Sequence, residues 1–157
     1  MAARKKPRSA LFAKPVPADD VVVACIRLGD TIVARLTPLA ASHGLTLLQY
    51  NVLRILYVKD AEGAGLPIGA VGAGLLVHAP DVTRLVDRLE QGELVERFRS
   101  PEDRRVVNVR LTDKGSALVE RFHPTLVEHN RKMLSAIPDA ELRHLAQNLS
   151  RALSALV

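Results

Sequence analysis

The sequence predicts a mainly α-helical protein with one small β-hairpin, an α+β fold. Apolar residues recur every three or four positions along most of the chain, which is the helical period. Strict alternation, the period of a strand, occurs only in two short runs on either side of the turn-rich "SPEDR". The chain is 48% hydrophobic but only 3% aromatic, so we expect a core of aliphatic side chains from packed helices. Its 157 residues fit one domain.

The first long helix is expected from Val21 to about Ala41, with Asp19 or Asp20 accepting hydrogen bonds from its first turn. Its side chains are apolar on nearly every face, and such a helix needs burial on more than one side. A single small domain rarely offers that much cover. The segment therefore predicts a second subunit, and we expect a homodimer.

The C-terminal part predicts two more helices. Thr112 can cap a long one, which Pro124 should kink, and Pro138 begins the last one. Along this last helix runs an apolar seam suited to dimerisation, formed by Leu142, Leu145, Leu149, Leu153 and Leu156.

The middle of the chain predicts three shorter helices. The first follows Thr46 as N-cap and stops at the turn-rich "AEGAGLP". "IGAVGAGLLV" predicts a short helix whose glycines favour close packing against a neighbour. "HAPDVTRLVDRLEQGE" is the clearest helix, with Pro80 in its first turn and Gly92 at its end. Its apolar stripe consists of Val82, Leu85, Val86 and Leu89, whereas Asp81, Arg84 and Arg88 share a different face.

The predicted hairpin consists of "LVERFR" and "RVVNVRL" around a loop. Arg104 and Arg105 fall at its far end, away from any core. The adjacent Asp103 can hold a guanidinium in one orientation through charge-assisted hydrogen bonds. An arginine held in this way suits a narrow, negative place such as the minor groove of DNA. From these residues alone, a surface hairpin with a local salt bridge is an equal alternative.

The formal charge of +5 equals the contribution of five basic residues near the N-terminus, so the rest of the chain sums to zero. These residues are Arg4, Lys5, Lys6, Arg8 and Lys14. Residues 1–18 are expected to be a basic tail, either solvated chain or an arm that lies along phosphates. Bulk charge alone is therefore weak support for a nucleic-acid partner.

Enzyme chemistry finds no support in the sequence. The five histidines lack metal-ligand spacing, and neither a Gly-rich phosphate loop nor a nucleophile elbow is present. We expect no metal and no cofactor. A single cysteine, no apolar segment of membrane-spanning length and no signal peptide predict a cytoplasmic protein without a membrane partner.

Three segments, "LTLLQYNVLRIL", "PDVTRLVDRLEQGELVER" and "SPEDRRVVNVRLTDKG", in this order and spacing, resemble the MarR family of winged helix-turn-helix regulators. The resemblance covers roughly Val21 to the C-terminus and is most specific from Pro80 to Gly115. It implies one domain over residues 19–157, with the DNA-binding winged helix at about 45–111 and dimerisation helices at about 20–42 and 112–156. It also implies a homodimeric repressor that binds double-stranded DNA at a palindromic operator and is released by a small phenolic or anionic effector.

The resemblance assigns DNA-binding roles to seven residues. Asp81, Thr83, Arg84 and Arg88 would lie on the recognition helix, and Arg105 would be the wing-tip arginine, with Asp103 as its orienting acid and Arg104 as its basic neighbour. One departure concerns the helix end. The family usually has a glycine directly before "LV", where this chain has Glu93 and places Gly92 one residue earlier. The helix is therefore expected to end in a different turn.

Several readings stay open at this point. Arg27, Asp30 and Arg54 could line a ligand pocket between the dimerisation and DNA-binding parts, or could be surface charges. Cys25 lies about one turn from the position that a peroxide-sensing branch of the family uses, so structural burial is favoured over redox sensing. The alternative functions are a redox-sensing regulator acting through Cys25 and a winged-helix protein-interaction module without operator binding.

Overall fold

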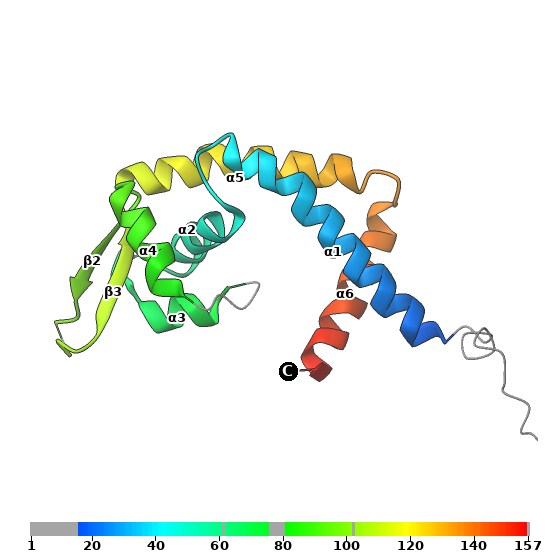
Figure 1. The fold of residues 1–157 in the computed structure, drawn as a ribbon, viewed down its shortest axis with the longest axis horizontal. Helices are drawn as coiled ribbons and strands as arrows, with labels where there is room; N and C mark the ends of the chain where they lie inside the picture. Colours follow the sequence, from blue (N-terminus) through cyan, green and yellow to red (C-terminus); the bar gives the residue numbers. More distant parts are fainter. Residues whose placement is uncertain (1–15, 61, 76–80, 102, 157) are drawn as a thin grey trace, which may run out of the picture. The chain divides into compact units, whose positions relative to one another are not determined.

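The computed structural model describes residues 16–60, 62–75, 81–101 and 103–156, and the order of its elements follows Figure 1. The helices are α1 (Pro17–Ala41), α2 (Leu47–Lys59), α3 (Ile68–Ala73), α4 (Val82–Gln91), α5 (Asp113–Met133) and α6 (Asp139–Leu156). The strands are β1 (Leu66–Pro67), β2 (Val95–Arg99) and β3 (Val107–Leu111). The chain divides into two compact units at Leu47–Leu48. Most of the expected basic tail lies outside the described residues, as do His78, Ala79 and Pro80.

The first unit contains α1, which begins four residues before the predicted start. Val16 is the N-cap with extended backbone and Pro17 is the first helical residue, while Asp19 and Asp20 lie in the first turn. Proline fits there because its fixed φ is helical and its missing N–H would have had no partner. The prediction that Asp19 or Asp20 caps the helix was therefore wrong, because no side chain makes the capping hydrogen bond.

The second unit surrounds a core formed by α2, α3, α4, β3 and α5. Its largest fully buried side chains are Phe122, Leu53, Leu56, Leu89, Val52, Val71, Val86 and Val109. Tyr50 meets Phe122 edge to face, with ring centroids 4.7 Å apart, and its hydroxyl is 2.8 Å from Nδ1 of His123. The core is almost wholly aliphatic, as predicted, and α4 and the hairpin pack on it through Val86, Leu89, Val95 and Val109.

The sheet has three antiparallel strands in the order β1-β3-β2. The predicted hairpin of β2 and β3 is confirmed, with Val95 opposite Leu111 and Arg99 opposite Val107. The third strand was not predicted, because "AEGAGLP" was interpreted only as a break. Its last two residues pair with β3, and a proline is tolerated there because β1 is an edge strand.

Glycine permits the close packing of the two short helices, as the sequence predicted. A Cβ atom on Gly72 of α3 would lie 3.0 Å from Cγ2 of Val82, the first residue of α4. A side chain at this position would press against the Val82 side chain, so glycine favours the close approach of α3 and α4. The pair forms a helix-turn-helix whose connecting residues 76–80 lie outside the described part of the chain.

The C-terminal helices begin where they were predicted. The Thr112 hydroxyl accepts a hydrogen bond from the backbone N–H of Gly115 at 3.0 Å and caps α5, which continues past Pro124. Helix α6 follows directly after Pro138 and has no buried residue in the single chain. Within the described residues, every helix is too short or too polar to cross a membrane.

Candidate nucleic-acid interface

Asp81 precedes the first residue of α4, and its carboxylate makes two contacts with Arg84. One carboxylate oxygen accepts a hydrogen bond from the backbone N–H of Arg84 at 3.0 Å, and the other lies 3.1 Å from its Nε. The first contact caps the helix, and the second restrains the arginine side chain. The sequence placed Asp81 among the DNA-binding residues, and in the structure it is the N-cap that holds Arg84.

The outer face of α4 carries the predicted arginines. Val86 and Leu89 are fully buried beneath the helix, whereas the Arg84 side chain is 78% exposed. Arg88, one turn further along, is also exposed and makes no ion pair within the described residues. Thr83 is also exposed, and its backbone carbonyl accepts a hydrogen bond from the Arg97 guanidinium. Two long guanidinium groups therefore project from one helix, suited to base edges or phosphates.

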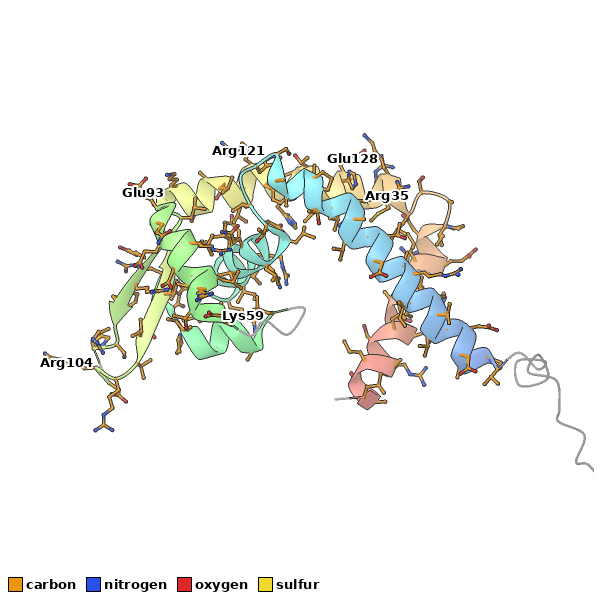
Figure 2. The ribbon with its side chains drawn as sticks, in the orientation of Figure 1. Arg35, Lys59, Glu93, Arg104, Arg121 and Glu128 are labelled. Carbon is orange, nitrogen blue, oxygen red and sulfur yellow. The ribbon has the colours of Figure 1, made fainter. Side chains whose placement is uncertain are left out.

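The wing extends from β2 and β3 and ends in exposed arginines. The loop is closed by hydrogen bonds from the Ser100 N–H to the Val106 carbonyl at 3.0 Å and from the Val106 N–H to the Asp103 carbonyl at 2.9 Å. Figure 2 shows Arg104 at the outer end of the hairpin and Glu93 near its base. Arg104 and Arg105 are both exposed, as predicted.

The acid beside them acts on the backbone. Asp103 Oδ1 accepts a hydrogen bond from the N–H of Arg105 at 2.9 Å, which is an Asx-type turn. Among the described residues, neither Arg104 nor Arg105 forms an ion pair with this carboxylate, so the predicted carboxylate–guanidinium contact is absent from this structure. Asp103 instead fixes the backbone from which the Arg105 side chain projects.

One residue of the interface was missed by the sequence analysis. Arg97, on β2, directs its guanidinium toward α4, where it lies 2.5 Å from Asp87 and 3.7 Å from Glu90. Its Nη2 also donates to the Thr83 carbonyl at 3.0 Å. The signal was present in the alternation of the strand, which put Arg97 on the same side as the buried Val95.

The turn after α4 shows how the chain manages its departure from the family pattern. Gly92 ends the helix as predicted, but Glu93 adopts a left-handed backbone with φ of 59°. This region favours glycine, the residue that the family usually has there. The Glu93 carboxylate lies 2.9 Å from Lys114, and this contact lowers its pKa from the usual value. The Glu93 carbonyl also accepts a hydrogen bond from the Thr112 hydroxyl at 2.7 Å.

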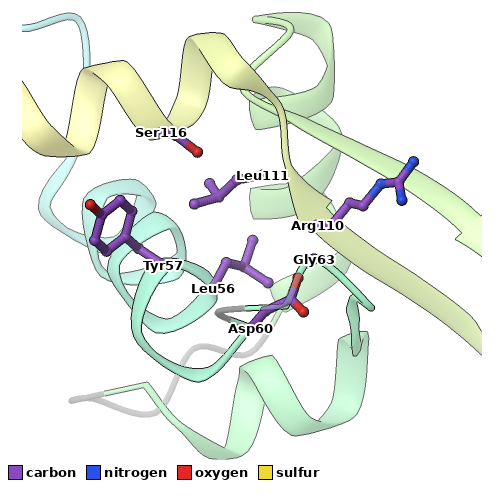
Figure 3. A pocket seen from close by; sticks show the side chains of 7 residues that line it. All are labelled: Leu56, Tyr57, Asp60, Gly63, Arg110, Leu111 and Ser116. Atoms are coloured by element: carbon purple, nitrogen blue, oxygen red, sulfur yellow. The ribbon is translucent and has the colours of Figure 1, made fainter.

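Two of the cavities in the second unit border α2. The first, of about 400 Å³, is shown in Figure 3 and is lined by Leu56, Tyr57, Asp60, Gly63, Arg110, Leu111 and Ser116. The second, of about 340 Å³, lies between α2 and α5 and is lined by Arg54, Tyr57, Val58, Val119, Glu120, His123 and Pro124. The Tyr57 hydroxyl donates to Glu120 at 3.1 Å, and this hydrogen bond raises the pKa of Tyr57. The second cavity thus combines apolar walls with a guanidinium, a hydroxyl, an imidazole and a carboxylate.

The structure brings only part of the predicted ligand pocket to a cavity. Arg54 lines the second cavity and donates to the Asn51 side chain at 3.1 Å. Arg27 and Asp30 are exposed on α1 in the first unit, so a shared pocket with Arg54 stays a prediction. Cys25 is exposed on α1 in the single chain, and the burial favoured by the sequence is not provided there.

A helix-turn-helix with outward arginines, followed by an arginine-tipped hairpin, defines a winged helix-turn-helix DNA-binding protein. The model of the MarR family matches residues 45–107. The chain is 33% identical over 109 residues to the HTH-type transcriptional regulator MhqR of Bacillus subtilis, covering 69% of this chain and 72% of the relative. It is 34% identical over 117 residues to PecS of Dickeya dadantii, covering 74% and 70%. The chain belongs to the MarR family of DNA-binding transcriptional regulators.

Solved structures share the fold. The MepR–DNA complex of Staphylococcus aureus superposes with a TM-score of 0.76 at 24% identity, covering 86% of this chain and 96% of that one. PcaV of Streptomyces coelicolor, in complex with its natural ligand, gives a TM-score of 0.74 at 23% identity, covering 85% and 92%. The predicted mainly helical fold with a small wing is thereby confirmed. The prediction of a transcriptional regulator is confirmed by the family membership that the sequence relatives show.

Proposed function

We propose that the protein is a homodimeric repressor that binds a palindromic operator and is released by a small phenolic or anionic effector. The observation that carries the DNA-binding part is the shared exposure of Arg84 and Arg88 on α4 and of Arg104 and Arg105 on the wing. A helix of this kind fits the major groove, and arginines at a hairpin tip fit the narrow, negative minor groove. A module that serves only protein contacts has no need of four outward arginines.

The dimer is supported by apolar side chains that the single chain leaves exposed. On α1 these include Val21, Val22, Val23, Ile26 and Val33, and on α6 they include Leu145, Leu149, Leu153 and Leu156. Exposed apolar rows of this length mark interfaces between proteins. A two-fold dimer would cover them and would present two recognition helices to the two halves of a palindrome. Sedimentation that showed a well-folded monomer at micromolar concentration would contradict the dimer.

Effector release is supported by the second cavity. Arg54 offers a cation to a carboxylate or phenolate, and Val58, Val119 and Pro124 offer apolar contacts to a ring. The Glu120 carboxylate that shares the cavity accepts a hydrogen bond from the Tyr57 hydroxyl. The relative named homoprotocatechuate degradative operon repressor, from Escherichia coli, is 24% identical over 131 residues, covering 83% of this chain and 86% of the relative. Thermal-shift screening with phenolic and carboxylic compounds tests this proposal, with Arg54→Ala as the variant that should lose the response.

The function is tested by a gel shift with the promoter DNA beside the protein's own gene, in the cytoplasmic setting where we place the protein. Wild-type protein should bind a palindromic site within it, and unlabelled DNA of scrambled sequence should compete poorly. Arg88→Ala should weaken binding, because Arg88 is exposed and supports no core. Failure of the wild type to bind any promoter fragment more tightly than scrambled DNA would favour the protein-interaction alternative.

A further inference from the structure

Arg97 makes contacts that neither a core residue nor a DNA-contacting residue needs. Its side chain leaves β2 and reaches three points on α4: the Asp87 carboxylate at 2.5 Å, the Glu90 carboxylate at 3.7 Å and the Thr83 carbonyl at 3.0 Å. Its own backbone N–H also donates to Glu90 at 3.3 Å. Thr83, Asp87 and Glu90 are spaced four and three residues apart, so they line one side of the helix over two turns.

The guanidinium is enclosed more than the other charges of the wing. The Arg97 side chain is 22% exposed, and its Nε is buried without an acceptor among the described residues. An ion pair withdrawn from solvent in this way is screened less by salt than an exposed pair. A planar guanidinium that bonds several acceptors at once also fixes an orientation, which a lysine cannot do.

A direct DNA contact does not account for this arrangement. The Arg97 charge faces two carboxylates and a carbonyl on α4, so no charge is left to neutralise a phosphate. Arg84 and Arg88, by contrast, point outward from the same helix. The core does not require the contact either, because the apolar side chains of Val86, Leu89 and Val95 are already buried. What the contact does is join β2 to one side of α4 over two turns of the helix.

We propose that Arg97 is a positioning residue that sets the angle between the recognition helix and the wing, so that both reach DNA at once. The inference rests on DNA binding through α4 and the wing. Two binding elements held at the correct separation gain affinity because the second contact becomes intramolecular. Without Arg97, each element keeps its arginines but must find its groove independently. The Asp87 and Glu90 carboxylates, placed near DNA at an apparent electrostatic cost, are explained as the receptors for Arg97.

The test compares Arg97→Gln, Asp87→Asn and their double variant by fluorescence anisotropy on promoter DNA at several salt concentrations. Arg97→Gln should weaken binding about tenfold, with the slope of log affinity against log salt unchanged because no phosphate contact is lost. Asp87→Asn should also weaken binding, although removing an acid near DNA should strengthen it on electrostatic grounds alone. The double variant should be no weaker than the more affected single variant, because both remove one contact. Arg97→Lys should not restore binding.

Arg110→Gln is the matched control. Arg110 forms an ion pair of the same length, 2.5 Å, with Glu96 across β2 and β3, but it does not touch α4. This variant should change affinity by less than about twofold. A shallower salt slope for Arg97→Gln would show that Arg97 binds a phosphate, and Asp87→Asn binding as tightly as the wild type would also overturn the proposal.

A measurement without DNA separates this inference from the proposed function. Spin labels at Arg88→Cys and Pro101→Cys, in a Cys25→Ser background diluted with unlabelled protein, report the distance from the recognition helix to the wing. The distance distribution should broaden or shift with Arg97→Gln and stay unchanged with Arg110→Gln. An unchanged distribution in Arg97→Gln would overturn the positioning role even if operator binding were confirmed.

Discussion

Gly115 lies in the first turn of α5, and its substitution by alanine provides the most direct test of the packing. In a helix with free space around it, alanine in place of glycine stabilises a protein by about 0.5–1 kcal/mol. At position 115 the added Cβ would lie 2.0 Å from the Leu94 carbonyl oxygen, 3.0 Å from the Leu94 carbonyl carbon and 3.2 Å from Cδ2 of Leu111. The nearest atoms belong to the backbone, so they cannot rotate away. The start of α5 must separate from the base of the hairpin.

That separation sets the size of the effect. The Thr112 N–H donates to the Leu94 carbonyl at 3.2 Å, and the Thr112 hydroxyl donates to the Glu93 carbonyl at 2.7 Å. Weakening these hydrogen bonds costs about 1 kcal/mol each, and overpacking adds about 1–3 kcal/mol. We therefore expect Gly115→Ala to lower the free energy of unfolding by about 3 kcal/mol, the opposite sign to helix propensity. For a chain of this size, the melting temperature should fall by roughly 6–12 °C.

Urea denaturation at a fixed protein concentration measures this effect, and Gly69→Ala is the control. Gly69 lies in α3, and a Cβ built there meets nothing within 4 Å, so this variant should be as stable as the wild type or slightly more stable. If Gly115→Ala unfolded at the same urea concentration as the wild type, the close approach of α5 to Leu94 would be wrong.

Five further variants test surface residues and the N-terminal tail. Arg105→Ala should weaken operator binding in a gel shift and leave the melting temperature unchanged, because its side chain is exposed at the wing tip. Asp103→Ala should also weaken binding by loosening the turn, and binding at least as tight as wild type would refute this role. Glu93→Gly should raise the melting temperature, because glycine tolerates φ of 59°. Glu128, whose pKa the neighbouring arginine lowers from 4.5 to about 2, stabilises the fold above its unfolded pKa, so the advantage of wild type over Glu128→Gln should vanish as pH falls from about 4.5 to 2. Deleting residues 1–15 should flatten the salt dependence of DNA binding if the basic residues touch phosphates.

The sequence predicted the elements that have a period and missed those that depend on distant partners. Helix α4 and the hairpin were predicted because their apolar spacing is visible within ten residues. Strand β1 has two residues, too few to show any alternation, and exists only because β3 offers it partners. The start of α1 was misjudged because residues 1–18 were assigned to the tail, although proline, here Pro17, is compatible with a first helical residue.

The residues of the candidate site likewise include some that the sequence identified and some whose role it could not show. The exposed arginines of α4 could be identified because they lie off its apolar stripe, and those of the wing because they lie in a turn-rich loop between two strands. The role of Arg97 could not, because its partner residues lie on another element and alternation says only which side it faces. Asp103 was correctly placed at the turn, but its choice of a backbone N–H over a guanidinium depends on the loop geometry.

The joint between α5 and the hairpin has a mechanical consequence. Thr112, at the start of α5, is hydrogen-bonded to the backbone of Glu93 and Leu94, and Gly115 leaves no room for a methyl group against Leu94. We therefore expect α5 and the hairpin to move as one rigid body. Strand β2 has five residues, which at about 3.3 Å each make an arm of roughly 17 Å. A rotation of α5 by about 5° would therefore carry the end of that arm by roughly 1.5 Å, half the length of a hydrogen bond. The wing tip thus amplifies small tilts of a helix that also borders the cavity that Arg54 lines.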